Sequence, residues 1–189
     1  MSRAIGFLAG KAGGRDVELG INDNGFYISG KEINIERVLK HLNSGNIEEI
    51  LKEAIENTEV LKRRFRNCAG RSLMILRNYK GRTKTTGRQQ MHSFLLLAAI
   101  RKLTKNFPIL QEARREVLED LMDLENAKKV LEAIRKNEIK LRYVETRIHS
   151  PFSLNLIMQG TSDLIKIEDK MNFLRRMHRE INEKIEEKN

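Results

Sequence analysis

The chain has 189 residues, of which 40% are hydrophobic, so it can bury a core and is not wholly disordered. The formal charge of +10 favours a polyanionic partner, and the single cysteine excludes an internal disulfide framework. The longest apolar run, residues 94–100, is too short to cross a bilayer, and no signal peptide is recognisable. We therefore expect a soluble, cytoplasmic protein without a membrane partner. Its composition resembles that of a thermophile's protein.

The N-terminal segment, residues 1–33, is predicted to combine the end of a helix with a β-hairpin. Residues 2–12 place apolar side chains on one side and end at a glycine pair, which is typical of a helix C-terminus. Apolar and polar residues alternate over residues 17–22, which is the period of a half-buried strand. The Asn-Gly pair at 24–25 suits a two-residue hairpin turn, and residues 26–28 return as the second strand.

Residues 34–137 follow a helical pattern and are predicted to form a helical core. Apolar side chains recur at helical spacing in six stretches, at residues 34–44, 46–55, 59–79, 88–105, 108–121 and 123–136. Residues 94–100 are apolar all round, so we expect the helix that contains them to be the central, buried one.

The rest of the chain is predicted to contain an extended strand and a loop at residues 138–162 and a C-terminal helix at residues 163–189. Apolar and charged residues alternate over residues 139–143, and the extended piece is predicted to end near residue 147. The predicted fold class is therefore α+β and predominantly helical, with the N-terminal β-hairpin packed on a multi-helix bundle and one further extended strand. We expect residues 1–189 to form a single module.

The positive charge is concentrated in residues 60–111, which we call the basic segment. It contains thirteen lysines and arginines and no acidic residue, whereas the rest of the chain carries 23 basic and 26 acidic residues. Because clustered like charges destabilise a folded protein, such a segment indicates a function that uses its charge. A merely solvated face is the simpler interpretation, but solvated helices usually interleave both signs.

Two features of the basic segment favour contact with a nucleic acid. On the predicted helix at 59–79 the arginines gather opposite an apolar stripe, and Gly70 among them permits close approach of another backbone. The loop at 81–87 lacks the glycine spacing of a phosphate-binding P-loop, yet its N–H groups, hydroxyls and cations suit a sugar-phosphate chain. Gln89 and Gln90, which follow the loop, are candidates for base contacts. The residues that we predict to contact the nucleic acid are Arg63, Arg64, Arg66, Arg71, Arg77, Lys80, Arg82, Lys84 and Arg88.

No pattern in the chain predicts catalysis. Metal-ligand spacing is missing between Cys68 and the four histidines, His41, His92, His149 and His178. Cys68 lies on the apolar stripe, so we expect it in the core. The acidic residues between 112 and 123 are interpreted as partners in intramolecular or interdomain ion pairs rather than as general acids. We predict no catalytic residue, no metal site and no cofactor site in this chain.

Six segments, in order along nearly the whole chain, resemble a known family. They are residues 21–26, 65–79, 87–90, 116–120, 150–156 and 159–163. The pattern is similar to that of the C-terminal DEAD/H-associated module of Lhr-type (large helicase-related) superfamily two helicases, which follows two motor domains and a winged helix.

The resemblance implies a part of an ATP-driven 3′-to-5′ translocase that unwinds DNA or RNA–DNA hybrids, in which this module helps to enclose the tracking strand. It implies single-stranded DNA or RNA, and the motor or winged-helix domains, as partners. ATP and Mg would be bound by motor domains that this chain lacks. Since the chain has no phosphate-binding loop and no DExH box, we expect it to have no enzyme activity of its own. We expect the chain to be either a fragment or a subunit of a split helicase.

Two functional hypotheses follow. In the first, the chain is a non-catalytic nucleic-acid-binding module that holds the sugar-phosphate backbone of the tracking strand without reading its sequence. In the second, it is a protein-interaction module whose basic face docks on helicase motor domains or another acidic partner, without direct nucleic-acid binding. A stand-alone RNA-associated protein is a more distant third alternative.

Overall fold

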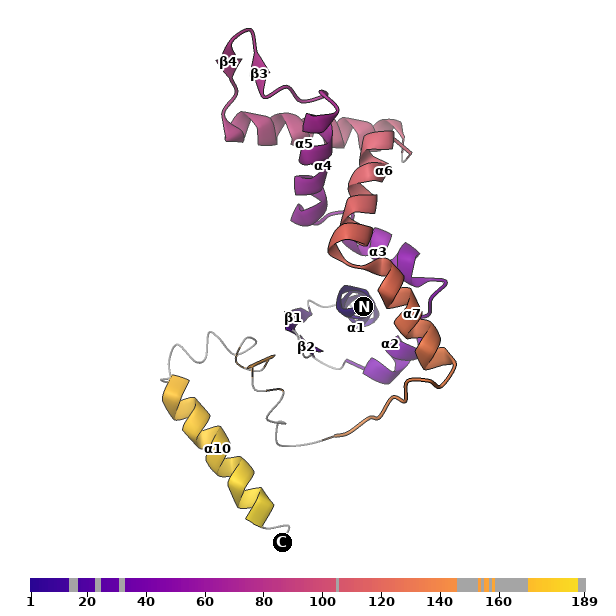
Figure 1. The fold of residues 1–189 in the computed structure, drawn as a ribbon, viewed down its shortest axis with the longest axis vertical. Helices are drawn as coiled ribbons and strands as arrows, with labels where there is room; N and C mark the ends of the chain where they lie inside the picture. The colour runs from indigo at the N-terminus through magenta and orange to yellow at the C-terminus, as the bar shows by residue number, and fades with distance from the viewer. Residues whose placement is uncertain are drawn as a thin grey trace. The chain divides into compact units, whose positions relative to one another are not determined.

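The structure is a computed structural model, shown in Figure 1. It describes residues 1–13, 17–22, 25–30, 33–104, 106–145, 153, 155–156, 158 and 170–186. The chain divides into two compact units, a larger one of Met1 with residues 39–139 and a smaller one of residues 2–38 with 140–189. Our expectation of one module over the whole chain stays a prediction.

The predicted N-terminal hairpin lies in the smaller unit, but its register differs from the prediction, because Gly25 begins the second strand instead of forming part of the turn. Its strands pair antiparallel, with Asn22 opposite Gly25, and the Asn22 side-chain oxygen accepts a hydrogen bond of 2.9 Å from the Gly25 N–H. The Leu19 side chain lies 3.6 Å from the point where a Cβ at Gly6 would stand, so the hairpin packs against α1. The elements are α1 (Ser2–Gly13), β1 (Glu18–Asn22), β2 (Gly25–Ser29), α2 (Ile35–His41, which continues into the larger unit) and α10 (Lys170–Glu186).

The larger unit is helical and is built around α4. Thr58 caps the start of this helix by accepting a hydrogen bond from the Leu61 N–H, and the side chains of Leu61 and Phe65 are fully buried. Helix α4 packs against α5, α6 and η1, and Leu110 and Val117 complete the same core. The elements are α3 (Ile47–Ile55), α4 (Glu59–Arg71), β3 (Asn78–Tyr79), β4 (Arg82–Thr83), α5 (Thr86–Leu103), α6 (Pro108–Arg115), the π-helix η1 (Glu116–Leu121) and α7 (Leu124–Arg135).

The fourth helix ends earlier than the sequence predicts. It stops at Arg71 rather than near residue 79, because Leu73 adopts a left-handed conformation with φ of 60°. A second hairpin, β3–β4, follows in place of the last predicted turns. Its two turn residues, Lys80 and Gly81, both have positive φ, as a type I′ turn requires. The predicted single stripe of arginines is therefore split between a helix and a hairpin.

The expectation of a central, buried fifth helix is wrong. Only Ser93, Leu97 and Ile100 of α5 are buried, whereas the side chains of Phe94 and Leu95 are 57% and 59% exposed. The described part of the chain covers one side of α5 and leaves the other side open. Apolar residues all round a helix therefore do not ensure burial here.

The fold class is confirmed, with most elements helical and a β-hairpin near the N-terminus. The predicted helix at 108–121 is continuous but changes to π-helical geometry at Glu116. Residues 140–145 form neither helix nor strand, so the further β-structure is the β3–β4 hairpin rather than the expected strand at 139–147. Residues 146 and 147 lie outside the described residues, as do the expected first turns of the C-terminal helix.

Glu48 of α3 forms an ion pair with Lys128 of α7 at 2.9 Å and a second with Lys52 at 2.7 Å. The hydrogen bonds from Lys52 and Lys128 lower the pKa of Glu48 to about 2. A carboxylate whose pKa falls on folding stabilises the protein above its unfolded pKa. This stabilisation is therefore lost as the pH falls from about 4.5 toward 2.

We predict that Glu48→Gln makes the free energy of unfolding less dependent on pH in that window. The measurement is urea unfolding between neutral pH and pH 2. The matched control is Glu49→Gln, because Glu49 is exposed and makes no ion pair with a residue that the structure describes. Equal pH dependence in wild type and Glu48→Gln would contradict the prediction.

Candidate nucleic-acid interface

A groove of about 860 Å³ lies between α4 and α5 in the larger unit, with Leu121 of η1 at its edge. Helix α4 contributes a row of cations, and α5 contributes Phe94, Leu97 and the polar Gln90. The cations in the lining are Lys62, Arg63, Arg64 and Arg66. The groove is thus lined by cations from α4 and by apolar side chains from α5 and η1.

Two of the four cations in this groove have no acidic partner among the described residues. Glu59, which is the single acidic residue of the lining, pairs with Lys62 at 2.7 Å. Arg64 lies 3.6 Å from the buried carboxylate of Glu116. Arg63 and Arg66 make no ion pair with any residue in the described ranges. Two guanidinium groups thus remain available to an anionic ligand.

Phe94 gives the groove an exposed aromatic ring. It is 57% exposed and lines the groove with Leu97 and Leu121. Aromatic side chains beside cations are the combination that binds single-stranded nucleic acids, because bases stack on the ring while phosphates pair with the cations. Sequence reasoning assigned Phe94 to the core and missed it. Its place within an acid-free segment is the signal that could have found it.

The structure distributes the nine predicted contact residues over three places. Arg63, Arg64 and Arg66 lie along α4, and Arg88 is exposed in the first turn of α5. Arg71 ends α4. The remaining four, Arg77, Lys80, Arg82 and Lys84, belong to the second hairpin and its flanks. Whether each of the nine contacts a nucleic acid stays a prediction.

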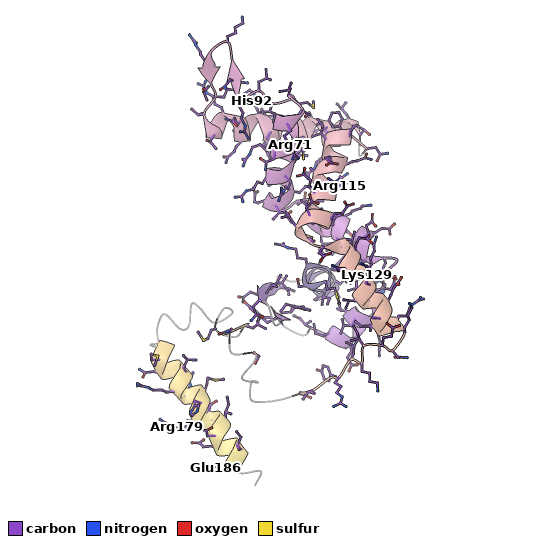
Figure 2. The ribbon with its side chains drawn as sticks, viewed as in Figure 1. Arg71, His92, Arg115, Lys129, Arg179 and Glu186 are labelled. Carbon is purple, nitrogen blue, oxygen red and sulfur yellow. The ribbon has the colours of Figure 1, made fainter. Side chains whose placement is uncertain are left out.

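Arg71 has an internal partner. Its guanidinium donates to a carboxylate oxygen of Glu116, whose side chain is only 6% exposed, and to the Cys68 sulfur at 3.3 Å. The hydrogen bond that Arg71 donates to the Glu116 carboxylate raises the pKa of Arg71. Arg71 and Arg115 are labelled on the neighbouring helices α4 and α6 in Figure 2. Arg71 thus contributes to the joint between α4 and η1.

Acidic residues on both flanks of the basic segment form intramolecular ion pairs, as the sequence predicts for those between 112 and 123. Arg115 pairs with Glu112 at 2.7 Å and with Glu119 at 2.9 Å. On the other flank, Glu56 pairs with Arg114 at 2.9 Å and with Arg101 at 3.2 Å. Of these cations only Arg101 belongs to the basic segment, and its partner, Glu56, comes from outside the segment.

Gln89 and Gln90 have different surroundings. The Gln89 side-chain amide donates to the Lys84 backbone carbonyl at 2.9 Å and thereby anchors the second hairpin to α5. Gln90 is exposed and lines the groove, so Gln90 is the better candidate of the two for a contact with a base.

Cys68 is buried, and burial raises the pKa of its thiol. Among the described residues, no group of three or more His, Cys, Asp or Glu side chains is arranged to hold a metal ion. Within the same ranges, no helix has the length and apolar character needed to span a membrane.

Comparison with known proteins identifies the family. The sequence model of the DEAD/H associated family matches residues 1–153, which is most of the chain. The chain therefore belongs to the DEAD/H-associated family, and its relatives are Lhr-type helicases.

Among these relatives, the ATP-dependent helicase Lhr-Core of Methanothermobacter thermautotrophicus is 47% identical over 98% of this chain and 22% of its own length. Lhr-Core of Saccharolobus solfataricus is 40% identical over 100% of this chain and 22% of its own length. The chain thus spans about a fifth of the length of these relatives.

A solved structure has a similar fold. It is that of Mycobacterium smegmatis helicase Lhr bound to ssDNA and AMP-PNP, with a TM-score of 0.68 and 26% sequence identity. The similarity covers 82% of this chain and 20% of the helicase chain. The fold of the chain therefore agrees with its place among Lhr-type helicases.

Removal of the Arg71 side chain leaves the buried Glu116 carboxylate with Arg64, 3.6 Å away, as its remaining cation. We predict that Arg71→Ala lowers the midpoint of urea unfolding, because an incompletely paired buried charge is costly. Adding Glu116→Gln removes that charge and is expected to restore part of the loss. If the double variant is as unstable as the sum of the single variants, Arg71 and Glu116 are not coupled.

Proposed function

We propose that the chain is a non-catalytic nucleic-acid-binding module of an Lhr-type helicase and holds a single strand in the groove between α4 and α5. The observation that carries this proposal is the pair of uncompensated guanidinium groups, Arg63 and Arg66, beside the exposed Phe94 ring. The similarity to a helicase chain that binds ssDNA supports it.

In this proposal, the phosphate and the base of a nucleotide contact different side chains of the groove. Arg63 and Arg66 donate to phosphate oxygens, with charge-assisted hydrogen bonds that are stronger than neutral ones. Phe94 stacks on a base, which every base permits because each has an aromatic face. The groove therefore binds without strong sequence preference, and the choice between DNA and RNA stays open. A cytoplasmic location also stays a prediction.

ATP and Mg belong to the helicase class but do not fit this chain. The glycine-containing turn at 81–87 follows a two-residue strand and lies partly within a hairpin, whereas a phosphate-binding loop joins a buried strand to a helix. In the groove lining, the single carboxylate, Glu59, is already paired with Lys62. No step of the proposed function uses a nucleotide cofactor in this chain.

We predict that Arg63→Ala with Arg66→Ala weakens binding of a single-stranded oligonucleotide and makes it less dependent on salt. Each single-strand phosphate that is neutralised contributes about 0.7 to the slope of log K against log salt. The slope is therefore expected to decrease by about 1.4 for two phosphates. Fluorescence anisotropy at several salt concentrations measures it. An unchanged slope, or a flat salt response of the wild type, overturns the proposed function.

We predict that Phe94→Ala also weakens single-strand binding, by about 5- to 150-fold, the equivalent of 1–3 kcal/mol for one stacked base. Leu95→Ala is the matched control, because Leu95 is equally exposed on α5 but does not line the groove. The same anisotropy assay compares the two. If both variants bind like the wild type, no base stacks on Phe94.

A second candidate function, docking on helicase motor domains or another protein, is favoured by a separate observation on α5. Met91, Leu95 and Leu103 recur at intervals of four or eight residues and are 59%, 59% and 82% exposed. Such a row of apolar side chains suits a protein partner. This function predicts tight binding to a separately expressed motor fragment, loss of that binding in Met91→Ser with Leu95→Ser, and little affinity for nucleic acid alone.

A further inference from the structure

The larger unit carries a second group of cations outside the groove, on the hairpin formed by β3 and β4. Asn78 pairs with Thr83 and Tyr79 with Arg82. The Lys84 N–H donates to the Arg77 carbonyl at 2.8 Å, so these two residues lie opposite each other at the base of the hairpin. We call residues 77–84 the basic hairpin.

Three cations share one face of the basic hairpin. Side chains alternate between the two faces along a strand, and residues directly opposite each other lie on the same face. The register therefore places Arg77, Lys84 and Arg82 on one face, and Asn78 and Thr83 on the other. Because like charges directly opposed destabilise a strand pair, Arg77 opposite Lys84 weakens the isolated hairpin.

No described residue offsets this repulsion. Arg77 and Arg82 are exposed and Lys84 is half-buried, and none of the three makes an ion pair with any residue whose position is described. The basic segment around the hairpin contains no acid at all. An external polyanion would supply the missing counter-charge.

The basic hairpin is also preformed. Lys80 and Gly81 make a tight turn in which both residues have positive φ, and Gln89 holds the Lys84 carbonyl against the start of α5. Figure 1 shows the hairpin extending away from the helices of its own unit. It presents a preformed cationic face to the solvent.

This face matches a duplex better than a flexible single strand. The hairpin is a two-stranded ribbon with regularly spaced cations, because residues two apart along a strand, such as Arg82 and Lys84, are about 6.7 Å apart. A two-stranded ribbon also fits the major groove. A duplex is the more densely charged polyanion, so each contact releases more counterions, with a salt slope of about 0.9 rather than 0.7 per phosphate.

We propose that the basic hairpin is a second nucleic-acid site, which binds the backbone of a duplex. The duplex site itself does not depend on the proposed function. The binding of a single-stranded part of the same substrate does, because the groove would hold it. With the strand site in the groove and the duplex site on the hairpin, the chain prefers a junction between single-stranded and double-stranded nucleic acid.

The experiment measures binding of the full chain to three DNA probes: a single strand, a blunt duplex, and a duplex with a single-stranded 3′ tail. The hairpin variant is Arg77→Ala with Arg82→Ala. Arg135→Ala with Lys136→Ala is the charge-matched control, because both residues are exposed at the end of α7. Arg77→Lys with Arg82→Lys keeps the charge and tests whether the loss is electrostatic.

The hairpin variant is expected to lose about tenfold in affinity for the duplex and the tailed duplex, with a decrease in salt slope of about 1.8. Single-strand binding and the control variant should stay within about twofold of the wild type, and the lysine variant should recover most of the loss. Equal weakening on all three probes, or no weakening on the duplex, overturns the duplex site.

The two proposals fail in different ways. If the wild type binds the duplex but not the single strand, the groove proposal fails and the hairpin proposal stands. If Arg63→Ala with Arg66→Ala loses single-strand binding while the hairpin variant still binds the duplex like the wild type, the hairpin proposal fails and the groove proposal stands. Thermal unfolding of each variant, monitored by circular dichroism, shows that lost binding is not lost folding.

Discussion

The larger unit depends on two glutamates that reach the basic segment from outside it. Glu56 pairs with Arg101 of α5 and Arg114 of α6, and Glu116 pairs with Arg71 of α4. Since the basic segment has no acid of its own, cations that face inward can be neutralised only by carboxylates from its flanks. Those carboxylates join the helices around the core, whereas Arg63 and Arg66 make no ion pair with a described residue.

This division of the charge gives the two sides of α4 different roles. Its inner side is apolar and ends at the joint with Glu116, where a buried carboxylate needs a cation to offset the loss of water. Its outer side carries Arg63 and Arg66 along the groove, where solvent already screens them. The same helix can therefore stabilise the fold and offer charge to a ligand without conflict.

Helix α5 shows how an apolar sequence can serve more than the core. Leu97 and Ile100 face the core, Phe94 lines the groove, and Leu95 belongs to an exposed row that runs from Met91 to Leu103. The exposed row is the observation behind the second candidate function, docking on another protein.

The sequence predicts the features that depend on near neighbours along the chain: the N-terminal hairpin although not its register, most of the helices, the acid-free basic segment, and the family. It did not predict the end of α4, because Leu73 in a left-handed conformation is against the preference of its residue type. The tertiary structure brings Arg71 and Glu116 together, a pair that the sequence does not predict because the two residues are 45 apart along the chain. It also decided that Phe94 is exposed, because burial depends on what packs against a helix and not on the helix alone.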